Sequence, residues 1–257
     1  MNDLATRLSK LARPAPAALE GNVLAAVGLV DRYALWPSPV GDLHVAFNDT
    51  GVSRVDLAAD DEEFEAVHLA EHGHRPVPAD EVPPIVRRRV TRAIAAGKPG
   101  QLALDMEDLT DFQRAVLRKA AEIPAGEVRP YGWIAKEIGK PGAVRSVGTA
   151  LARNPIPVII PCHRVVKSDG SLGRYSLGED ENKRTLLEAE GMDTGQYQSL
   201  TTRGIRFTGS DTTHIFCNPT CGGARRTMED HTVEFHSESE ARAAGYRPCL
   251  VCRPVAA

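Results

Sequence analysis

Apolar and polar residues alternate in three short runs near the N-terminus, with the two-residue period of β-strands. These runs are 33–36, 43–47 and 52–57. The segment Asn48–Gly51 between the second and third runs has the composition of a hairpin turn. Helical spacing follows over about 62–72 and 84–96, and Leu102–Leu104 is a candidate further strand. The pattern predicts a small α+β domain over residues 1–108.

The clearest helix start in the chain is a capping box. Thr110 is followed three residues later by Gln113, and apolar residues at helical spacing continue up to the break at Pro124. A closing helix is predicted over about 181–190. We therefore expect a second, mainly helical domain over residues 109–192.

Within this domain, two short helices over 131–138 and about 143–153 are joined by the tight turn Lys140-Pro141-Gly142. Short helices linked in this way fit a helix-turn-helix, although many helical domains contain similar hairpins. Residues 193–205 predict a linker, so the third domain, over 193–257, consists of this linker and a small terminal module.

Composition is that of a globular protein, with 42% hydrophobic and 25% charged residues. The first 30 residues, rich in Ala and Pro, predict a loosely structured lead-in without a secretory signal. No apolar run approaches the roughly 20 residues of a membrane helix, so we expect a cytoplasmic protein. Basic residues outnumber acidic ones by 13 to 10 over 110–192, but acidic ones prevail by 17 to 11 over 1–109. The basic middle part favours contact with phosphate, unless this is only solvated helix charge.

The five cysteines fall into two groups, because one stands alone and four form two close pairs. The paired cysteines are Cys217, Cys221, Cys249 and Cys252. Without a secretory signal, such pairs are typical of metal ligands rather than disulfides, and four thiolates suit tetrahedral zinc. A segment too short to bury a core could be stabilised by that metal. The alternative is a set of free or redox cysteines.

The lone Cys162 could be a small core residue, as most buried cysteines are. His163 and Arg164 follow it directly, Arg145 lies in the preceding helix, and Glu190 lies in the next one. A thiol is a good nucleophile only as thiolate, which a base oriented by a carboxylate can generate. We therefore expect Cys162 to be ionised at the mouth of a cavity, beside His163 and Glu190.

The run Pro161-Cys162-His163-Arg164-Val165 closely resembles the active-site signature of the methylated-DNA–protein-cysteine methyltransferases, or alkylguanine-DNA alkyltransferases. The resemblance extends from Thr110 to about Met192 through several landmarks in the same order. These are Arg145-Ser146-Val147-Gly148, Asn154-Pro155, Gly173-Arg174-Tyr175-Ser176, Leu186-Leu187 and Glu190-Gly191. The N-terminal part is similar to the family's first domain through Trp36-Pro37 and Gly41-Asp42-Leu43.

This resemblance implies an α+β protein with a ribonuclease H-like N-terminal domain and a winged helix-turn-helix alkyltransferase domain. It also implies irreversible, single-turnover repair of O6-alkylguanine, and of O4-alkylthymine, by transfer of the alkyl group to Cys162. The partner would be double-stranded DNA, bound through its minor groove by a monomer without organic cofactor or membrane. The alkylated base is packed in the helical stack, so the nucleotide must be flipped out before it can react.

The same resemblance implies roles for individual residues. Cys162 accepts the alkyl group, His163 acts as base through a water molecule, and Glu190 orients His163. Asn154 braces the active-site turn, and Tyr131 helps to rotate the nucleotide and donates a hydrogen bond or proton to the base. The alternatives are that Tyr131 is a packing residue and that Glu190 is a surface acid at a helix end.

Further residues are implied to contact the substrate. Arg145 would occupy the space left in the duplex by the flipped nucleotide; the alternatives are a phosphate contact and a surface charge. Tyr175 and Ser176 would line the guanine pocket, with Ser176 near the alkylated oxygen. Pro157 and Leu151 would supply its apolar wall.

The C-terminal segments 212–221 and 243–254 resemble the metal-binding module of the Ada family of alkylation-response proteins. The resemblance implies zinc held by the four paired cysteines. In full-length members the first cysteine also accepts methyl groups from DNA phosphotriesters. Here the module follows the alkyltransferase domain, and Asn218 stands where an arginine is usual, so a structural role is favoured for Cys217.

Two other classes of function compete with repair by alkyl transfer. One is a binder that flags damage, similar to alkyltransferase-like proteins, but those proteins lack the acceptor cysteine that Cys162 provides. The other is a transcription factor switched by methylation. The sequence contains no additional sequence-specific DNA-binding motif, so repair is the main prediction.

Overall fold

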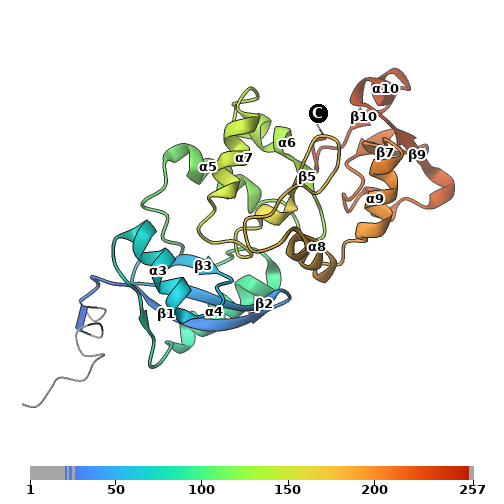
Figure 1. Cartoon of the computed structure of the whole chain (residues 1–257). Coiled ribbons are helices and arrows are strands. Elements are labelled where there is room, and N and C mark those ends of the chain that lie inside the picture. Colours follow the sequence, from blue (N-terminus) through green and yellow to red (C-terminus); the bar gives the residue numbers. More distant parts are fainter. Residues whose placement is uncertain (1–20, 22, 25–26, 255–257) are drawn as a thin grey trace, which may run out of the picture.

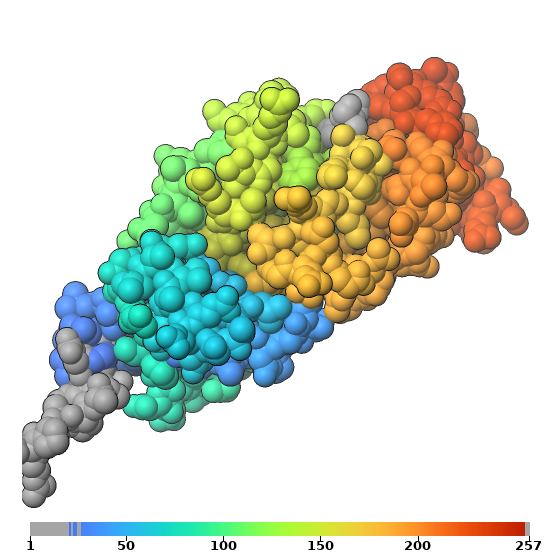
Figure 2. Space-filling view, in the orientation of Figure 1, coloured from blue at the N-terminus to red at the C-terminus, as the bar shows by residue number. Residues whose placement is uncertain are grey.

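The computed structural model describes residues 21, 23–24 and 27–254, so most of the predicted lead-in lies outside the described residues. Figure 1 shows an N-terminal sheet with helices, a helical middle part and a C-terminal part of short strands and helices. The middle part lies between the other two, and together they form one elongated body (Figure 2). The predicted mixture of helix and sheet is confirmed. Within the described ranges, no helix is long and apolar enough to cross a bilayer.

The N-terminal part is a four-stranded sheet with strand order β3-β2-β1-β4. Its strands are β1 (Arg32–Ser38), β2 (Gly41–Phe47), β3 (Val52–Asp56) and β4 (Val77–Pro78). Its helices are α3 (Asp61–His72) and α4 (Pro84–Ala96). The antiparallel pairing of β1 with β2 places Trp36 opposite Leu43, and both side chains are buried. The three alternating strands and the two helices are thus confirmed.

The further strand predicted at Leu102–Leu104 is reduced to a single parallel bridge between Leu104 and Val52. The amide of Leu102 donates to the carbonyl of Pro99 at 3.0 Å, so this end of the segment is used in a turn. An extended strand cannot form there because a backbone group bonded within a turn is not available to a sheet.

The middle part is mainly helical. Its elements are α5 (Asp111–Ala120), β5 (Arg129–Pro130), α6 (Tyr131–Glu137), α7 (Val144–Ala152), η1 (Cys162–Arg164), β6 (Val165–Val166) and α8 (Asp180–Ala189). The predicted capping box is present, because Thr110 Oγ1 accepts from Gln113 N at 3.3 Å and Gln113 Oε1 accepts from Thr110 N at 2.9 Å. Helix α5 ends at Ala120, earlier than predicted, because Ile123 N donates to Ala120 O in a tight turn.

Helices α6 and α7 lie where two short helices joined by a turn were predicted. Gly139 in the connection has a φ of 72°, a left-handed conformation that glycine adopts at no steric cost. Strand β5 pairs in parallel with β6, with Arg129 opposite Val165. This pairing places the start of α6 beside the segment that leaves η1.

Helix α9 (Thr194–Thr202) occupies the segment that the sequence predicted as a linker, so the connection between the two parts is helical. Its N-cap is Asp193, whose side chain accepts from Gln196 N at 2.7 Å. Tyr197 of this helix is buried in a cluster that includes Leu187 of α8. The helix forms because it covers apolar surface of the middle part, which its weak periodicity does not reveal.

The C-terminal module contains a second four-stranded sheet, with strand order β10-β8-β7-β9. Its elements are β7 (Phe207–Ser210), β8 (Ile215–Cys217), η2 (Ala224–Arg226), η3 (Glu229–His231), β9 (Thr232–Phe235), α10 (Glu238–Ala243) and β10 (Arg247–Pro248). The core cluster of this sheet is small and mainly aromatic, comprising Phe207, Phe216, Phe235, Ala241 and Tyr246. A core of this size is marginal on its own.

Candidate active site and metal centre

Cys162 is the first residue of η1 and follows a loop held by one amide side chain. Asn154 Nδ2 lies 2.9 Å from the carbonyl oxygen of Ile160 and 3.3 Å from Cys162 Sγ. Its Oδ1 accepts from the amide of Ile156 at 3.1 Å. Val158 in this loop has a φ of 68°, which is strained for a β-branched residue. Asn154 therefore braces a tight turn that presents the thiol.

Burial decides the protonation state of Cys162, which is 7% exposed. Desolvation raises the pKa of the thiol and outweighs the hydrogen bond from Asn154 and the charge of Lys183, which act in the opposite direction. Burial therefore favours the neutral thiol in the resting site, whereas the sequence had led us to expect an ionised sulfur. Its proton must be removed during the reaction, which is a task for a nearby base.

His163 is fully buried and is paired with Glu190, the residue that ends α8. His163 Nε2 lies 2.7 Å from Glu190 Oε1, while its Nδ1 is buried without a partner among the described residues. Burial lowers the pKa of His163, which keeps the imidazole neutral and able to accept a proton.

Arg164 holds the other side of the same carboxylate, a contact that sequence reasoning missed. Its Nε lies 2.9 Å from Glu190 Oε2 and its Nη2 lies 2.7 Å from Oε1, in a bidentate pair. The amide of Gly126 also donates to Glu190 Oε2 at 3.1 Å. Burial opposes the charge of Glu190, but the hydrogen bonds from His163 and Arg164 prevail and lower its pKa to about 2.

Lys183 of α8 is a second buried cation that the sequence did not reveal. Its ammonium group donates to the carbonyl oxygens of Val165 and Leu172, both at 2.6 Å. Burial lowers its pKa to about 8. The only sign of this burial in the sequence was the spacing of Lys183, which places it on the same face of α8 as Leu186 and Leu187. The charge of Lys183 favours the thiolate of Cys162.

Tyr131 and Arg145 come from the two helices of the predicted helix-turn-helix. Tyr131 begins α6, and a Cβ added to Gly148 of α7 would lie 3.9 Å from its ring, so the ring lies against α7. Burial raises the pKa of Tyr131, so it remains a phenol able to donate a hydrogen bond. Arg145 is exposed on α7, and its guanidinium makes no hydrogen bond or ion pair with the described residues.

The residues predicted to surround the guanine separate into buried and exposed ones. Leu151 and Pro157 are buried, and Tyr175 is 9% exposed. The ring of Tyr175 meets His163 edge-on, with ring centroids 6.2 Å apart, and burial raises the pKa of its hydroxyl, which lies near Cys162. Ser176 is exposed.

A cavity of about 460 Å³ lies between the middle part and the N-terminal sheet. Asn154, Pro157 and Ser176 line it, together with residues of β3 such as Arg54. Cys162 is not among its lining residues, but Asn154, whose Nδ2 lies 3.3 Å from the sulfur of Cys162, does line it. The structure brings Asn154, Tyr175 and Ser176 close to the sulfur of Cys162 and pairs the adjacent His163 with Glu190, whereas Arg145 is exposed on α7.

The four paired cysteines come together in the C-terminal module, and their Sγ atoms all lie within 4.8 Å of one another. Cys217, Cys221 and Cys252 are buried, and Cys249 is half-buried. Four thiolates around one zinc ion would be about 3.8 Å apart, given Zn–S bonds of about 2.3 Å in a tetrahedron. The amide of Asn218 donates to Cys252 Sγ and that of Gly223 to Cys221 Sγ, both at 3.4 Å. The donor set and its backbone support therefore fit zinc.

Two known families match this chain in succession. Residues 111–192 match the DNA-binding domain of 6-O-methylguanine DNA methyltransferase, and residues 197–255 match the metal-binding domain of Ada. The site built around Cys162 lies in the first match, and the four paired cysteines lie in the second.

Curated relatives and solved structures agree with the first of these matches. A methylated-DNA–protein-cysteine methyltransferase of Methanosarcina barkeri is 39% identical over 163 residues, which are 62% of this chain and 96% of the relative. One from Mus musculus is 45% identical over 100 residues, or 38% of this chain and 46% of the relative. The crystal structure of Mycobacterium tuberculosis OGT in complex with DNA matches with a TM-score of 0.51 at 34% identity, covering 66% of this chain and 98% of that one.

Proposed function

The chain belongs to the methylated-DNA–protein-cysteine methyltransferases, and from this premise we propose that it repairs O6-alkylguanine, and O4-alkylthymine, by alkylating its own Cys162. The observation that carries the proposal is the contact of 2.7 Å between His163 and Glu190, directly beside a buried thiol. An imidazole oriented by a carboxylate is the arrangement that activates a nucleophile.

The transfer step follows from the protonation states of these groups. His163 takes the proton of the neutral Cys162 thiol through a water molecule, and Glu190 stabilises the imidazolium that forms. The thiolate then attacks the alkyl carbon, so that a C–S bond forms while the bond from carbon to the guanine oxygen breaks. Tyr131 donates a proton or a hydrogen bond to the leaving base. The thioether has no easy reversal, so each molecule acts once.

The reaction requires the alkylated nucleotide to leave the duplex, and we propose that α7 enters the minor groove for this purpose. The exposed Arg145 would occupy the vacated space, and Tyr131 would help to rotate the nucleotide. The minor groove presents a degenerate code, which suits a protein that acts on damage in any sequence.

The flipped base would be held by the residues nearest the thiol. Tyr175 and Ser176 would line the guanine pocket, with Ser176 near the alkylated oxygen, and Pro157 and Leu151 would supply its apolar wall. This assignment is supported by the edge-on packing of Tyr175 on His163 and by the hydroxyls of Tyr175 and Ser176, which both lie near the sulfur of Cys162.

The C-terminal module and the domain boundaries complete the proposal. We assign a structural zinc ion to the four paired cysteines, which would cross-link the two ends of a module with a small core. The domains would be a ribonuclease H-like part over 1–108, a winged helix-turn-helix transferase part over 109–192 and the module with its leading helix over 193–257. We propose that the protein acts as a monomer on double-stranded DNA.

Transfer of a labelled methyl group from a duplex containing O6-methylguanine tests the function. The chain should become labelled once, and the Cys162→Ala variant should bind the duplex without becoming labelled. Label on the variant would overturn the assignment.

A further inference from the structure

The C-terminal module is attached to the transferase part through residues that adjoin its own cysteines. The carbonyl oxygen of Cys252 accepts from Trp133 Nε1 at 3.0 Å. Thr220, which precedes Cys221, accepts from the amide of Val128 at 2.9 Å. Both cysteine pairs, at opposite ends of the module's sequence, thus contribute a bond to the same short segment.

Two further contacts repeat this pattern. Gly222, which follows Cys221, donates its amide to Glu127 Oε1 at 2.8 Å. Arg253, which follows Cys252, lies 2.8 Å from Glu137 of α6 and 5.8 Å from the ring centroid of Trp133. The module is therefore bonded to residues 127–137, which run from just before β5 to the end of α6.

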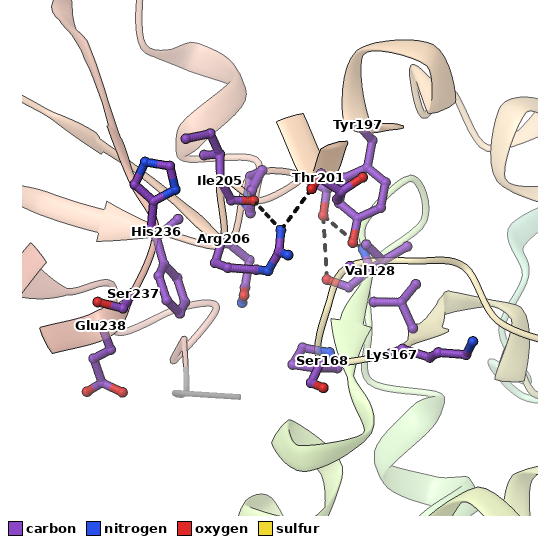
Figure 3. Close-up of a pocket in the computed structure, with 17 residues that line it drawn as sticks. Val128, Lys167, Ser168, Tyr197, Thr201, Ile205, Arg206, His236, Ser237 and Glu238 are labelled. Carbon is purple, nitrogen blue, oxygen red and sulfur yellow. Dashed lines mark hydrogen bonds between the residues drawn. The ribbon is translucent and has the colours of Figure 1, made fainter. Parts of the chain in front are cut away.

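On the other side of Val128 the two parts are separated by a cavity of about 240 Å³. Figure 3 shows Lys167 and Ser168 on the transferase side of this cavity, with Arg206 and His236 on the module side. The bonds from the cysteine loops thus lie beside a cavity between the two parts, which Val128 and Thr220 both line.

The same segment supports the reactive groups. Gly126 donates its amide to Glu190 Oε2 at 3.1 Å. Strand β5 pairs with β6, which follows directly on Cys162–Arg164. Tyr131 begins α6, two residues before the Trp133 that holds Cys252. Displacement of this segment would move the partner of Glu190 and the start of the helix that carries Tyr131.

We propose that the zinc module is a positioning element of the transfer site, and that Trp133 is the positioning residue through which it acts. The inference rests on the proposed function, because it concerns the rate of transfer to Cys162. Metal binding would fix the two cysteine loops. The fixed loops would in turn hold residues 126–133 in the place that Glu190 and Tyr131 require.

Matched variants can isolate this effect. Trp133→Phe removes the N–H that reaches Cys252 and keeps an aromatic ring in the core. Trp36→Phe is its control, because Trp36 is equally buried in the N-terminal sheet and its N–H has no partner among the described residues. Thr220→Val removes a hydroxyl that bridges the two parts, whereas Thr232→Val removes one bonded within the module to Met228.

The experiment uses the full zinc-loaded chain and two readouts. The first is the single-turnover rate constant of methyl transfer at saturating duplex, which is insensitive to changes in DNA affinity. The second is hydrogen–deuterium exchange of the amides over 122–131. We expect Trp133→Phe and Thr220→Val each to slow transfer about fivefold, the effect of losing one net hydrogen bond, and to speed exchange. The two controls should change neither quantity.

Removing zinc from the wild-type chain with a chelator should produce the same two changes, and restoring zinc should reverse them. If zinc removal and both bridging variants leave exchange and rate unchanged while wild-type Cys162 is still methylated, the module is only tethered and the inference is wrong. If no wild-type chain is methylated, the proposed function fails. The exchange readout then still decides whether zinc orders residues 122–131.

Discussion

His163 Nε2 lies 2.7 Å from Glu190 Oε1, although the two residues are 27 positions apart in the sequence. The same carboxylate is held by Arg164, so it stays ionised, with a pKa of about 2. One imidazole nitrogen is thereby fixed, and the other is left to receive the proton of a buried thiol. This relationship explains how a neutral cysteine can act as the acceptor.

Replacement of Glu190 by glutamine should slow transfer strongly. An amide cannot stabilise the imidazolium of His163, and it leaves the buried guanidinium of Arg164 without its counter-ion. We expect the single-turnover rate constant to fall about 100-fold, the lower end for loss of a general base. Glu188→Gln is the control, because Glu188 lies in α8 two residues before Glu190, is exposed, and accepts a hydrogen bond from Thr194 rather than from His163. Equal rates for wild type and Glu190→Gln would contradict the role of this pair.

Gly97 keeps space open for the same ion pair. It has a φ of 53°, and an added Cβ would clash with Arg164 Nη2 and lie 2.7 Å from Glu190 Oε1. Gly97→Ala should therefore lower the free energy of unfolding by about 3 kcal/mol and slow transfer, since it combines backbone strain with overpacking. Gly73→Ala, at the corresponding end of α3, has a φ of 78° with open space around it and should cost only about 1 kcal/mol. Thermal unfolding measures both, and indistinguishable melting temperatures would refute the clash.

Asp31 should make the stability of the N-terminal sheet depend on pH. Burial opposes its charge, but hydrogen bonds from His68, Ser53 and Asn48 prevail and lower its pKa from 3.8 to about 2. A carboxylate with a lowered folded pKa stabilises the protein above its unfolded pKa, and this contribution is lost as the pH falls from about 4 to about 2. It amounts to about 2 kcal/mol.

Denaturant unfolding at several pH values checks this prediction. Asp31→Asn should remove part of the loss of stability on acidification, and Asp42→Asn, at an exposed position, is the control. An acid-induced loss of the same size in Asp31→Asn and wild type would show that Asp31 is not responsible.

The four-thiolate site predicts a definite metal content. Elemental analysis should find about one zinc per chain, because a single tetrahedral ion takes all four sulfur atoms. Cys249→Ser should lose zinc and lower the melting temperature of the module, and Cys162→Ser should keep both unchanged. Full zinc content in Cys249→Ser would count against the four-sulfur site.

Much of the fold could be predicted because its signals are local. The alternation of β1 to β3 and the capping box at Thr110 depend on neighbouring residues, and both are observed. Helix α9 was missed because its period is weak, and only the N-cap Asp193 indicated where it begins. Its stability depends on apolar contacts with α8 that no local pattern encodes.

The residues of the site were predicted from the resemblance to the alkyltransferase family, whose motifs occur here in the same order. The long-range contacts between these residues were not predicted. The bidentate hold of Arg164 on Glu190 and the bond from Trp133 to Cys252 join residues 26 and 119 positions apart. Burial raises the pKa of Cys162, and the depth of a residue depends on the whole packed structure. Sequence reasoning therefore could not show that burial favours the neutral form of the acceptor.

The central claim is that the sulfur of Cys162 takes the alkyl group. Mass spectrometry of the intact chain and its peptides, after incubation with a duplex containing O6-methylguanine, tests this most directly. We predict one added methyl group per molecule, located on Cys162, with no further addition when fresh duplex is supplied. An unmodified Cys162, or a methyl group on any other residue, would contradict the account.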